Sequence, residues 1–310
     1  GFGVKENNFL GRGIGLDTNF LISTESFKGK FSATNSNFNN SDKSLYISAE
    51  SSENDNFETF GYKTNKTGLT IGTDFEYLND FFVGINNSNY YEVIETNSTA
   101  SAQQQAQEGN YWDSFMKFNM NYDKRNQKFQ TSSGFLSYYS LDLPIISDTN
   151  TIKNYYNYSH YFNFFEKNFS SISLYLQSAH SLNNKDIKLS ERIKIPSSRL
   201  RGFEAGRVGP KDGDDYIGGN YAYSINFISN VPQLFEDSQN LDFLFFIDAA
   251  EIWGVDYNSS IKGDGIRSSV GVGLDWNSPV GPMNFTLAYP ITKENGDKTE
   301  TIRFNLGTTF

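Results

Sequence analysis

Residues 67–77 read TGLTIGTDFEY, and their side chains alternate between two chemical types. The odd positions include Leu69, Ile71, Phe75 and Tyr77, whereas the even positions hold glycine, threonine or a carboxylate. Successive side chains of a β-strand point to opposite faces, so this period of two predicts a strand with one apolar and one polar face. A soluble β-sandwich contains such strands too, but small or charged polar positions are typical of a water-filled barrel lumen.

The same alternation recurs along the chain, for example at residues 270–276, 283–289 and 302–310. No segment of convincing length has the helical period, and residues 97–109 are low in apolar content, so we expect a long external loop there. The pattern predicts about fifteen strands, at residues 1–6, 13–24, 26–36, 43–53, 59–77, 80–95, 111–124, 131–144, 151–165, 168–181, 216–229, 239–251, 266–277, 282–291 and 300–310.

The chain is polar on average, with 37% hydrophobic residues and a mean hydropathy of −0.54, yet 16% of its residues are aromatic. Intrinsic disorder is disfavoured, because disordered chains are poor in aromatic residues. Helical membrane spans are excluded, because no stretch approaches about 18 consecutive apolar residues. A barrel strand passes this test, since it needs only about 9–11 residues and turns only alternate ones toward lipid.

The chain length fits one barrel. At roughly 20 residues for a strand and its connection, 310 residues make about 15–16 strands. A soluble all-β protein of this length would need several sandwich domains, and no Pro/Gly-rich linker divides the chain. We therefore expect a single all-β domain over residues 1–310, a transmembrane antiparallel β-barrel of the outer-membrane type.

Composition also narrows the chemistry. The net charge of −10 argues against a nucleic-acid partner, which would favour a basic face. The two histidines, His160 and His180, lie on predicted strands, and a hydrolase would need a Ser or Asp beside one of them. We expect lumenal or interfacial histidines and no enzyme. No His, Cys or carboxylate spacing predicts a metal or cofactor site, because the acidic run 212–215 lacks the pattern of a calcium loop.

Three segments in the last third of the chain carry a family resemblance. Residues 200–204 read LRGFE and lead to Gly209-Pro210, residues 246–253 read FIDAAEIW, and residues 271–290 contain WNSPVGP and end in AYP. In this order they resemble the BamA family, with its (V/L)RGF loop motif, its F-x-D-x-G-x-x-W strand and its conserved tail. Ala250 stands where the strand motif of the family has glycine.

The resemblance implies a sixteen-stranded barrel that follows POTRA domains in the full-length protein. Residues 7–13, NNFLGRG, look like the turn after the second strand of the family. We therefore expect this chain to begin within the second strand and to lack the first, which accounts for an odd count of fifteen. The POTRA domains are expected upstream of these residues.

In the family, an arginine of the sixth outer loop contacts acidic groups of the inner barrel wall, and Arg201 and Asp248 match these positions. The strand period also places Asp248 in the lumen, because the odd positions from 241 to 247 are apolar and an ionised Asp facing lipid is costly. A guanidinium can form a two-point bond with this carboxylate. The alternative is a solvated loop arginine, the usual state of this residue type. Gly202 is expected to supply a backbone conformation that other residues resist, and Phe203 an apolar anchor.

Many family members carry a second acidic wall residue, and Asn226 stands at that position here. It faces the lumen, because Ile225 and Phe227 on either side belong to the outward phase. Asn226 can accept a hydrogen bond from Arg201 but adds no charge, so we expect either a weaker contact or compensation by Glu204 or Asp242.

The terminal strand has an apolar stripe that ends in an aromatic carboxy-terminal residue, formed by Ile302, Phe304, Leu306 and Phe310. It resembles the β-signal of outer-membrane proteins, and most outer-membrane barrels end this way, so the stripe indicates location rather than function. In BamA-like proteins the last strand pairs weakly with the first, and Gly307 would weaken that pairing further. Such a seam is an exposed edge able to template an incoming strand.

The resemblance implies insertion and assembly of β-barrel proteins in the bacterial outer membrane, through a lateral seam between the first and last strands. The expected partners are unfolded outer-membrane proteins, the lipid bilayer and assembly lipoproteins that bind through the POTRA region. A TamA-like assembly factor and a two-partner secretion transporter of the same superfamily are alternatives that the number of POTRA domains would separate. A passive porin is a further alternative, separable by its large and steady conductance.

Overall fold

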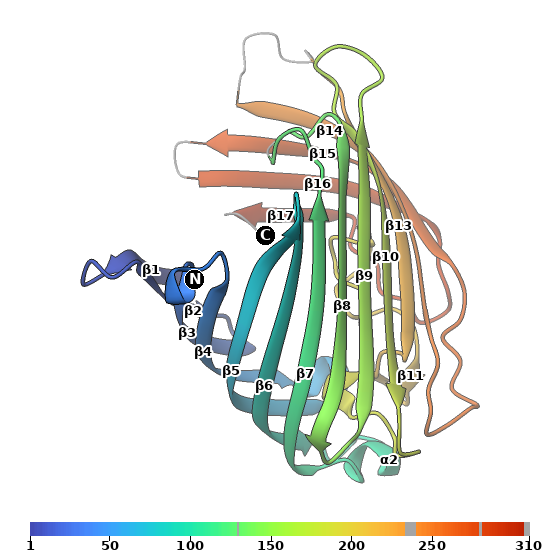
Figure 1. Cartoon of the computed structure of the whole chain (residues 1–310). Coiled ribbons are helices and arrows are strands. Elements are labelled where there is room, and N and C mark those ends of the chain that lie inside the picture. Colours follow the sequence, from blue (N-terminus) through green and yellow to red (C-terminus); the bar gives the residue numbers. More distant parts are fainter. Residues whose placement is uncertain (129, 233–239, 279–280, 307–310) are drawn as a thin grey trace.

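The computed structural model describes residues 1–128, 130–232, 240–278 and 281–306. Fifteen strands of these residues form one antiparallel sheet, in which each strand pairs with the next strand of the sheet along the chain (Figure 1). They are β1 (Phe2–Phe9), β2 (Ile14–Ile22), β3 (Ser26–Asn35), β4 (Ser44–Asn56), β5 (Tyr62–Leu78), β6 (Phe81–Thr96), β7 (Gly109–Asp123), β8 (Gly134–Ser147), β9 (Thr151–Phe162), β10 (Ser170–Ser181), β13 (Tyr221–Asn230), β14 (Leu241–Trp253), β15 (Arg267–Ser278), β16 (Gly281–Thr292) and β17 (Ile302–Leu306).

Each predicted strand overlaps one strand of this sheet, because the period of two is a local property of the chain. Three predicted starts lie three or more residues too early, and one of them, at residue 131, is replaced by Gly134 as the first residue of β8. The strand expected from residue 59 begins at Tyr62, since α1 (Phe57–Phe60) precedes it and ends at Gly61, whose φ is +75°. The strand expected from residue 216 begins at Tyr221. Residue 216 instead belongs to a separate hairpin of β11 (Lys211–Asp212) and β12 (Asp215–Tyr216).

The expected external loop at 97–109 contains a short helix, α2 (Ala102–Gln105), with a capping box between Ser101 and Gln104. Gln104 is fully buried and donates to the carbonyl of Phe60 over 3.3 Å, while the Ser101 hydroxyl donates to Asp212. The loop therefore packs on other connections at one end of the sheet, where Figure 1 shows α2 and β11 together. In the described part of the chain, no helix is long and apolar enough to cross a membrane.

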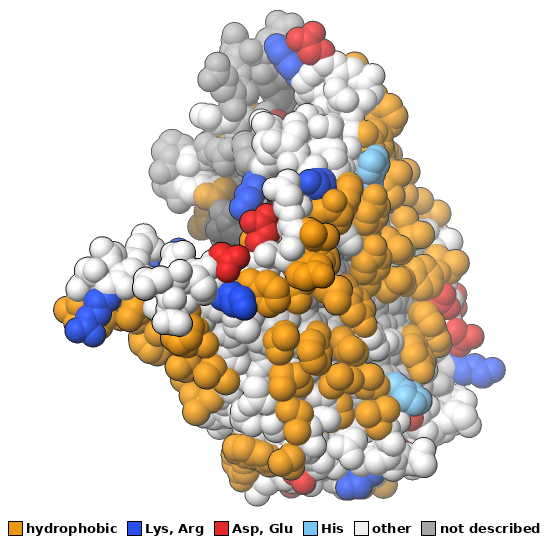
Figure 2. Space-filling model, in the orientation of Figure 1, with side chains coloured by type: hydrophobic (Ala, Val, Ile, Leu, Met, Phe, Trp, Pro, Cys, Tyr) orange, Lys and Arg blue, Asp and Glu red, His pale blue; other side chains and the backbone are white. Residues whose placement is uncertain are grey.

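The two faces of the sheet have opposite chemistry. Apolar side chains such as Leu69, Ile225 and Leu287 lie on the outside with about half of their surface exposed, and Figure 2 shows hydrophobic side chains spread over this face. Polar side chains such as Ser224 and Ser269 are completely buried on the inside. A soluble protein has the reverse arrangement, whereas a barrel with an apolar outer band in lipid and a polar interior requires this one.

The edges of the described sheet are β1 and β17. Because fifteen strands alternate in direction, these two edge strands run the same way. A closed barrel in which all pairs are antiparallel has an even number of strands, so β1 and β17 cannot form an antiparallel pair with each other. Gly1 and Phe2 on one edge and Leu306 on the other line a common hollow of about 640 Å³. The sheet thus curls until the start of β1 and the end of β17 border the same hollow, and the marks of the two chain ends lie near each other in Figure 1.

Candidate functional site

The connection between β10 and β13, residues 182–220, folds into the lumen, and we call it the lumenal loop. Six of its apolar side chains are buried against the inner wall in one cluster. The cluster contains Ile187, Ile193, Ile195, Leu200, Phe203 and Val208 from the loop, and Tyr175, Ala179, Ala222, Ala250 and Ile252 from the wall. The burial of this much apolar surface makes the loop a packed part of the interior rather than a mobile external segment.

Arg201 of the lumenal loop forms a two-point ion pair with Asp248 of β14. Its Nε lies 2.8 Å from one carboxylate oxygen and its Nη2 lies 2.7 Å from the other. The backbone N–H of Arg201 donates to the same carboxylate over 3.0 Å. Asp248 is 0% exposed, so its charge depends on these donors, and the bidentate geometry is the strong form of this interaction.

Asn226 lies directly opposite Asp248 in the register of β13 and β14. The expected acceptor role toward Arg201 is wrong: the amide of Asn226 donates to Asp248 over 2.7 Å and to the carbonyl of Arg199 over 2.8 Å. It supplies one more donor to the buried carboxylate and fixes the main chain beside Arg201. The candidates for compensation are engaged elsewhere, because Glu204 pairs with Arg207 and Asp242 accepts from Gln130.

Arg201 also contacts an aromatic ring of β14, which the sequence did not indicate. Phe246 belongs to the inward phase together with Asp248, is completely buried, and places its ring 3.6 Å from the guanidinium carbon of Arg201. Arginine stacks well on an aromatic face. The signal in the sequence is an apolar residue at an inward position of β14, where Leu244 and Phe246 interrupt the alternation.

Gly202 and Phe203 hold the loop against the last strands. Gly202 has a φ of +89°, and a Cβ built there would lie 3.2 Å from the Cβ of Ala288 in β16, so glycine satisfies both the backbone and the close approach. Phe203 is 1% exposed within the apolar cluster. Its carbonyl accepts a hydrogen bond from Arg303 of β17 over 3.0 Å.

The terminal strand carries its stripe outward. Ile302, Phe304 and Leu306 expose more than half of their surface, whereas Arg303 points inward. Arg303 bonds to Glu300 and donates to the carbonyl of Ser197 over 3.2 Å, so β17 is tied to the lumenal loop. Sequence reasoning missed Arg303, because a single basic residue at a lumenal position has no distinctive pattern. Gly307 and Phe310 lie outside the described residues.

The histidines are not in the lumen. His160 and His180 are both exposed, and His160 pairs in register with Ile172, which belongs to the outward stripe of β10. Of the two expected positions, lumenal or interfacial, the exposure of both histidines rules out the lumenal one. Where the structure describes the chain, no three or more His, Cys, Asp or Glu side chains are grouped so that they could hold a metal ion.

Known proteins share both the sequence and the shape of this chain. Residues 8–310 match the Omp85 superfamily domain. The outer membrane protein assembly factor BamA of Neorickettsia risticii is 33% identical over 117 residues, which are 36% of this chain and 16% of that protein. The crystal structure of BamA from Haemophilus ducreyi lacking POTRA domains 1–3 superposes with a TM-score of 0.89 at 22% identity, covering 97% of this chain and 65% of the other. CdiB from Acinetobacter baumannii superposes with a TM-score of 0.63 at 11% identity, covering 97% of this chain and 55% of that chain.

Proposed function

Because the chain belongs to the Omp85 superfamily, we propose that it inserts and assembles β-barrel proteins at a lateral seam of its own sheet. It is an integral outer-membrane β-barrel protein with the BamA barrel fold. The chain spans less than two thirds of its solved BamA counterpart, so substrates and accessory lipoproteins of the whole protein are part of the proposal. The proposed substrates are unfolded outer-membrane proteins.

The observation that carries the proposal is the edge strand β17. It pairs with β16 through five residues, 302–306, and no second neighbour of β17 lies among the described strands. The backbone N–H of Ala288 donates to the carbonyl of Thr301. Hydrogen-bonded pairs alternate in an antiparallel ladder, so the backbone N–H and C=O groups of Arg303 and Asn305 point toward β16, whereas those of Phe304 point toward the free side. An edge of this kind presents unpaired N–H and C=O groups to an incoming strand.

The membrane supplies the free energy for this step. An unpaired backbone group costs several kcal/mol in lipid, so a substrate strand that reaches the membrane gains strongly by pairing with a free edge. The lumenal loop holds that edge in place through Arg303 and keeps the wall behind it rigid through Arg201 and Asp248. This mechanism needs only strand pairing, so we propose that the chain works without catalysis, nucleotide or metal.

The proposal is tested by disulfide cross-linking, since the chain contains no cysteine. Asn305→Cys on β17 is combined with a single cysteine in the last strand of an arrested barrel substrate. Ser173→Cys is the matched control, because β10 is paired on both sides, by β9 and β13. We expect a cross-link from position 305 and none from position 173. Equal and low yields at both positions would rule out assembly at this seam.

The porin alternative is disfavoured by the packed lumenal loop, whose apolar cluster occupies the interior against β10, β13 and β14. Planar-bilayer conductance distinguishes the two functions. A seam-gated assembly protein conducts poorly and irregularly, whereas a porin gives a large and steady current. TamA-like and two-partner secretion proteins are alternatives within the superfamily, and a count of POTRA domains in the full gene product is the measurement that separates them from the proposed function.

A further inference from the structure

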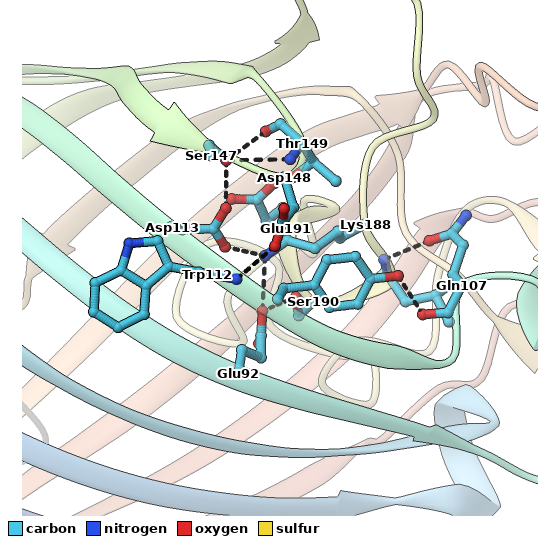
Figure 3. Close-up of polar contacts among 12 residues, drawn as sticks. Glu92, Gln107, Trp112, Asp113, Ser147, Asp148, Thr149, Lys188, Ser190 and Glu191 are labelled. Carbon is cyan, nitrogen blue, oxygen red and sulfur yellow. Dashed lines mark hydrogen bonds and ion pairs between the residues drawn. The ribbon is translucent and has the colours of Figure 1, made fainter.

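A second charged group of the lumenal loop, Lys188, contacts a different part of the wall from Arg201, at β6 and β7 rather than at β14. Lys188 is 2% exposed, and its ammonium donates to Glu92 of β6 over 2.9 Å and to Asp113 of β7 (Figure 3). Both carboxylates are also buried, at 2% exposure. Three ionised groups removed from water are tolerated only where their charges and hydrogen bonds are satisfied.

The surroundings supply those hydrogen bonds. Ser190 donates to Glu92 over 3.0 Å, and the hydroxyl of Ser147 donates to Asp113, as Figure 3 shows. The backbone N–H of Leu189 donates to the side chain of Gln107 over 3.0 Å, so the main chain of the loop is held at the same place. The site is therefore built from both sides, by the loop and by strands β6 to β8.

Lys188 stays charged in this site. Burial alone lowers its pKa, but the nearby carboxylates of Glu191, Glu92 and Asp113 outweigh burial and raise it. The pKa of Glu191, which burial would raise, is lowered by Lys153 and Lys188. Lys153 of β9 lies 3.1 Å from Glu191, which extends the network to a further strand of the wall.

A neighbouring contact ties the loop to the same part of the sheet. The ammonium of Lys194 lies 3.3 Å from the ring centroid of Phe60 and donates to the hydroxyl of Tyr62 over 2.8 Å. That hydroxyl donates in turn to the carbonyl of Leu189 over 3.1 Å. The loop is thus bonded to β5, β6 and β7 around residues 188–194, and to β13 and β14 around residue 201.

We propose that Lys188 is a positioning residue through which the lumenal loop connects two halves of the sheet and holds them at a fixed distance, as a strut. One half contains β5 to β7 and the other contains β14 to β16. The Lys188 contacts fix one end of the strut to β6 and β7, and the Arg201 contacts fix the other end to β14. The strut sets the spacing of the halves, and with it the relative position of the sheet edges. This inference goes beyond the proposed function and is measured without any substrate, so either can fail alone.

The test is a distance measurement between spin labels on the outer face, in the protein reconstituted in lipid vesicles. One label pair, at Leu69→Cys of β5 and Leu287→Cys of β16, spans the two halves. A second pair, at Leu69→Cys and Met120→Cys of β7, lies within one half. All three positions are exposed on the outer face, so labels there leave the lumen intact.

Lys188→Met removes the tie and leaves two buried carboxylates. We expect a second, shifted distance for the label pair across the halves, and an unchanged distance for the pair within one half. Breaking a buried ion pair should raise the population of the displaced loop on the order of 100-fold. A variant that merely loosens the fold would broaden the distance distributions of both label pairs, whereas a positioning role predicts a change only for the pair across the halves.

Lys117→Met is the matched control, because among the described residues Lys117 forms an ion pair only with Asp142, over 3.4 Å between β7 and β8. We expect its distances to equal those of the parent. Glu92→Gln keeps the bond between Lys188 and Asp113 and should give a smaller shift of the same kind, which maintains the test if Lys188→Met does not fold. An unchanged distance across the halves in folded Lys188→Met, or an equal shift in Lys117→Met, would overturn the proposal.

Discussion

The lumenal loop is held to the wall by two ionic contacts of different chemistry, a first anchor of Arg201 with Asp248 and a second anchor of Lys188 with Glu92 and Asp113. At the carboxy-terminal wall, the planar guanidinium of Arg201 faces one carboxylate, Asp248, and matches it with two parallel bonds. At the amino-terminal wall, the compact ammonium of Lys188 is shared by Glu92 and Asp113. The first anchor is neutral, whereas the group of Lys188, Glu92 and Asp113 carries one surplus negative charge, which the hydroxyl donors Ser147 and Ser190 help to stabilise.

This difference predicts that loss of a carboxylate costs more at the first anchor than at the second. Asp248→Ala leaves Arg201 and Asn226 without their shared acceptor, and we expect a loss of about 3–5 kcal/mol in the free energy of unfolding. Asp113→Ala leaves Lys188 paired with Glu92, so we expect roughly 1–3 kcal/mol. Urea unfolding in lipid vesicles, followed by tryptophan fluorescence, measures both.

Asp242→Ala is the control for that comparison, because Asp242 lies on the same strand and only accepts from Gln130 among the described residues. It should cost less than about 0.5 kcal/mol. A loss of unfolding free energy in Asp113→Ala that equals or exceeds the loss in Asp248→Ala would show that the second carboxylate does not compensate for the first at Lys188.

Exchanging the two cations sharpens the comparison. Arg201→Lys gives up one of the two parallel bonds and the ring contact with Phe246, and we expect a loss of about 2 kcal/mol. Lys188→Arg places a larger group in a closed site and should cost about 1–3 kcal/mol through overpacking. The same unfolding assay checks both, with Lys28→Arg on the exposed pair with Glu50 as a control expected to be neutral. A neutral exchange at either anchor would contradict the assigned chemistry.

Gly202 permits the close approach of the first anchor to β16. Gly202→Ala should cost about 2 kcal/mol, because the new Cβ meets Ala288 and the positive φ is strained. Gly213→Ala is the matched variant in the same loop, since its φ is also positive and nothing lies within 4 Å of a Cβ there. It should cost only the backbone strain, about 1 kcal/mol. Equal losses in the unfolding assay would show that the close approach contributes nothing.

The last comparison concerns pH and separates Lys194 from Lys188. Burial lowers the pKa of Lys194 to about 7, so above that pH the unfolded chain binds more protons than the folded chain. Stability should therefore rise with pH from 7 toward the ordinary lysine pKa near 10.4, by at most about 1.4 kcal/mol per pH unit. Lys188 has a raised pKa, so its stabilising contribution is complete below the ordinary value and adds no slope there.

Lys194→Met removes the titrating group at this site, so its unfolding free energy should be flatter between pH 7 and pH 10 than that of the parent. Lys117→Met serves as the control and should keep the slope of the parent. The measurement is urea unfolding in vesicles at a series of pH values. A slope that persists in Lys194→Met would assign it to another group.

The sequence was sufficient for the strands and for one anchor. The alternation around Leu69 and Ile71 is set by neighbouring residues, so each strand and its outward face could be predicted without knowing any partner strand. Arg201 and Asp248 were paired because each lies in a recognisable motif and the period of β14 turns Asp248 inward. The same reasoning misjudged Asn226, since the direction of an amide hydrogen bond depends on acceptors supplied by other segments.

The second anchor shows what the tertiary structure alone decided. Lys188 is separated from Asp113 by 75 residues and from Glu92 by 96, and no motif or period connects the three. The register of β6 and β7 pairs Glu92 with Tyr111 and Tyr90 with Asp113, which sets the two carboxylates on one face of the wall. The folding of the lumenal loop then brings Lys188 to them. Local alternation determines which way a side chain points, but only strand register and loop packing determine which distant charge it meets, because those depend on contacts across the whole barrel.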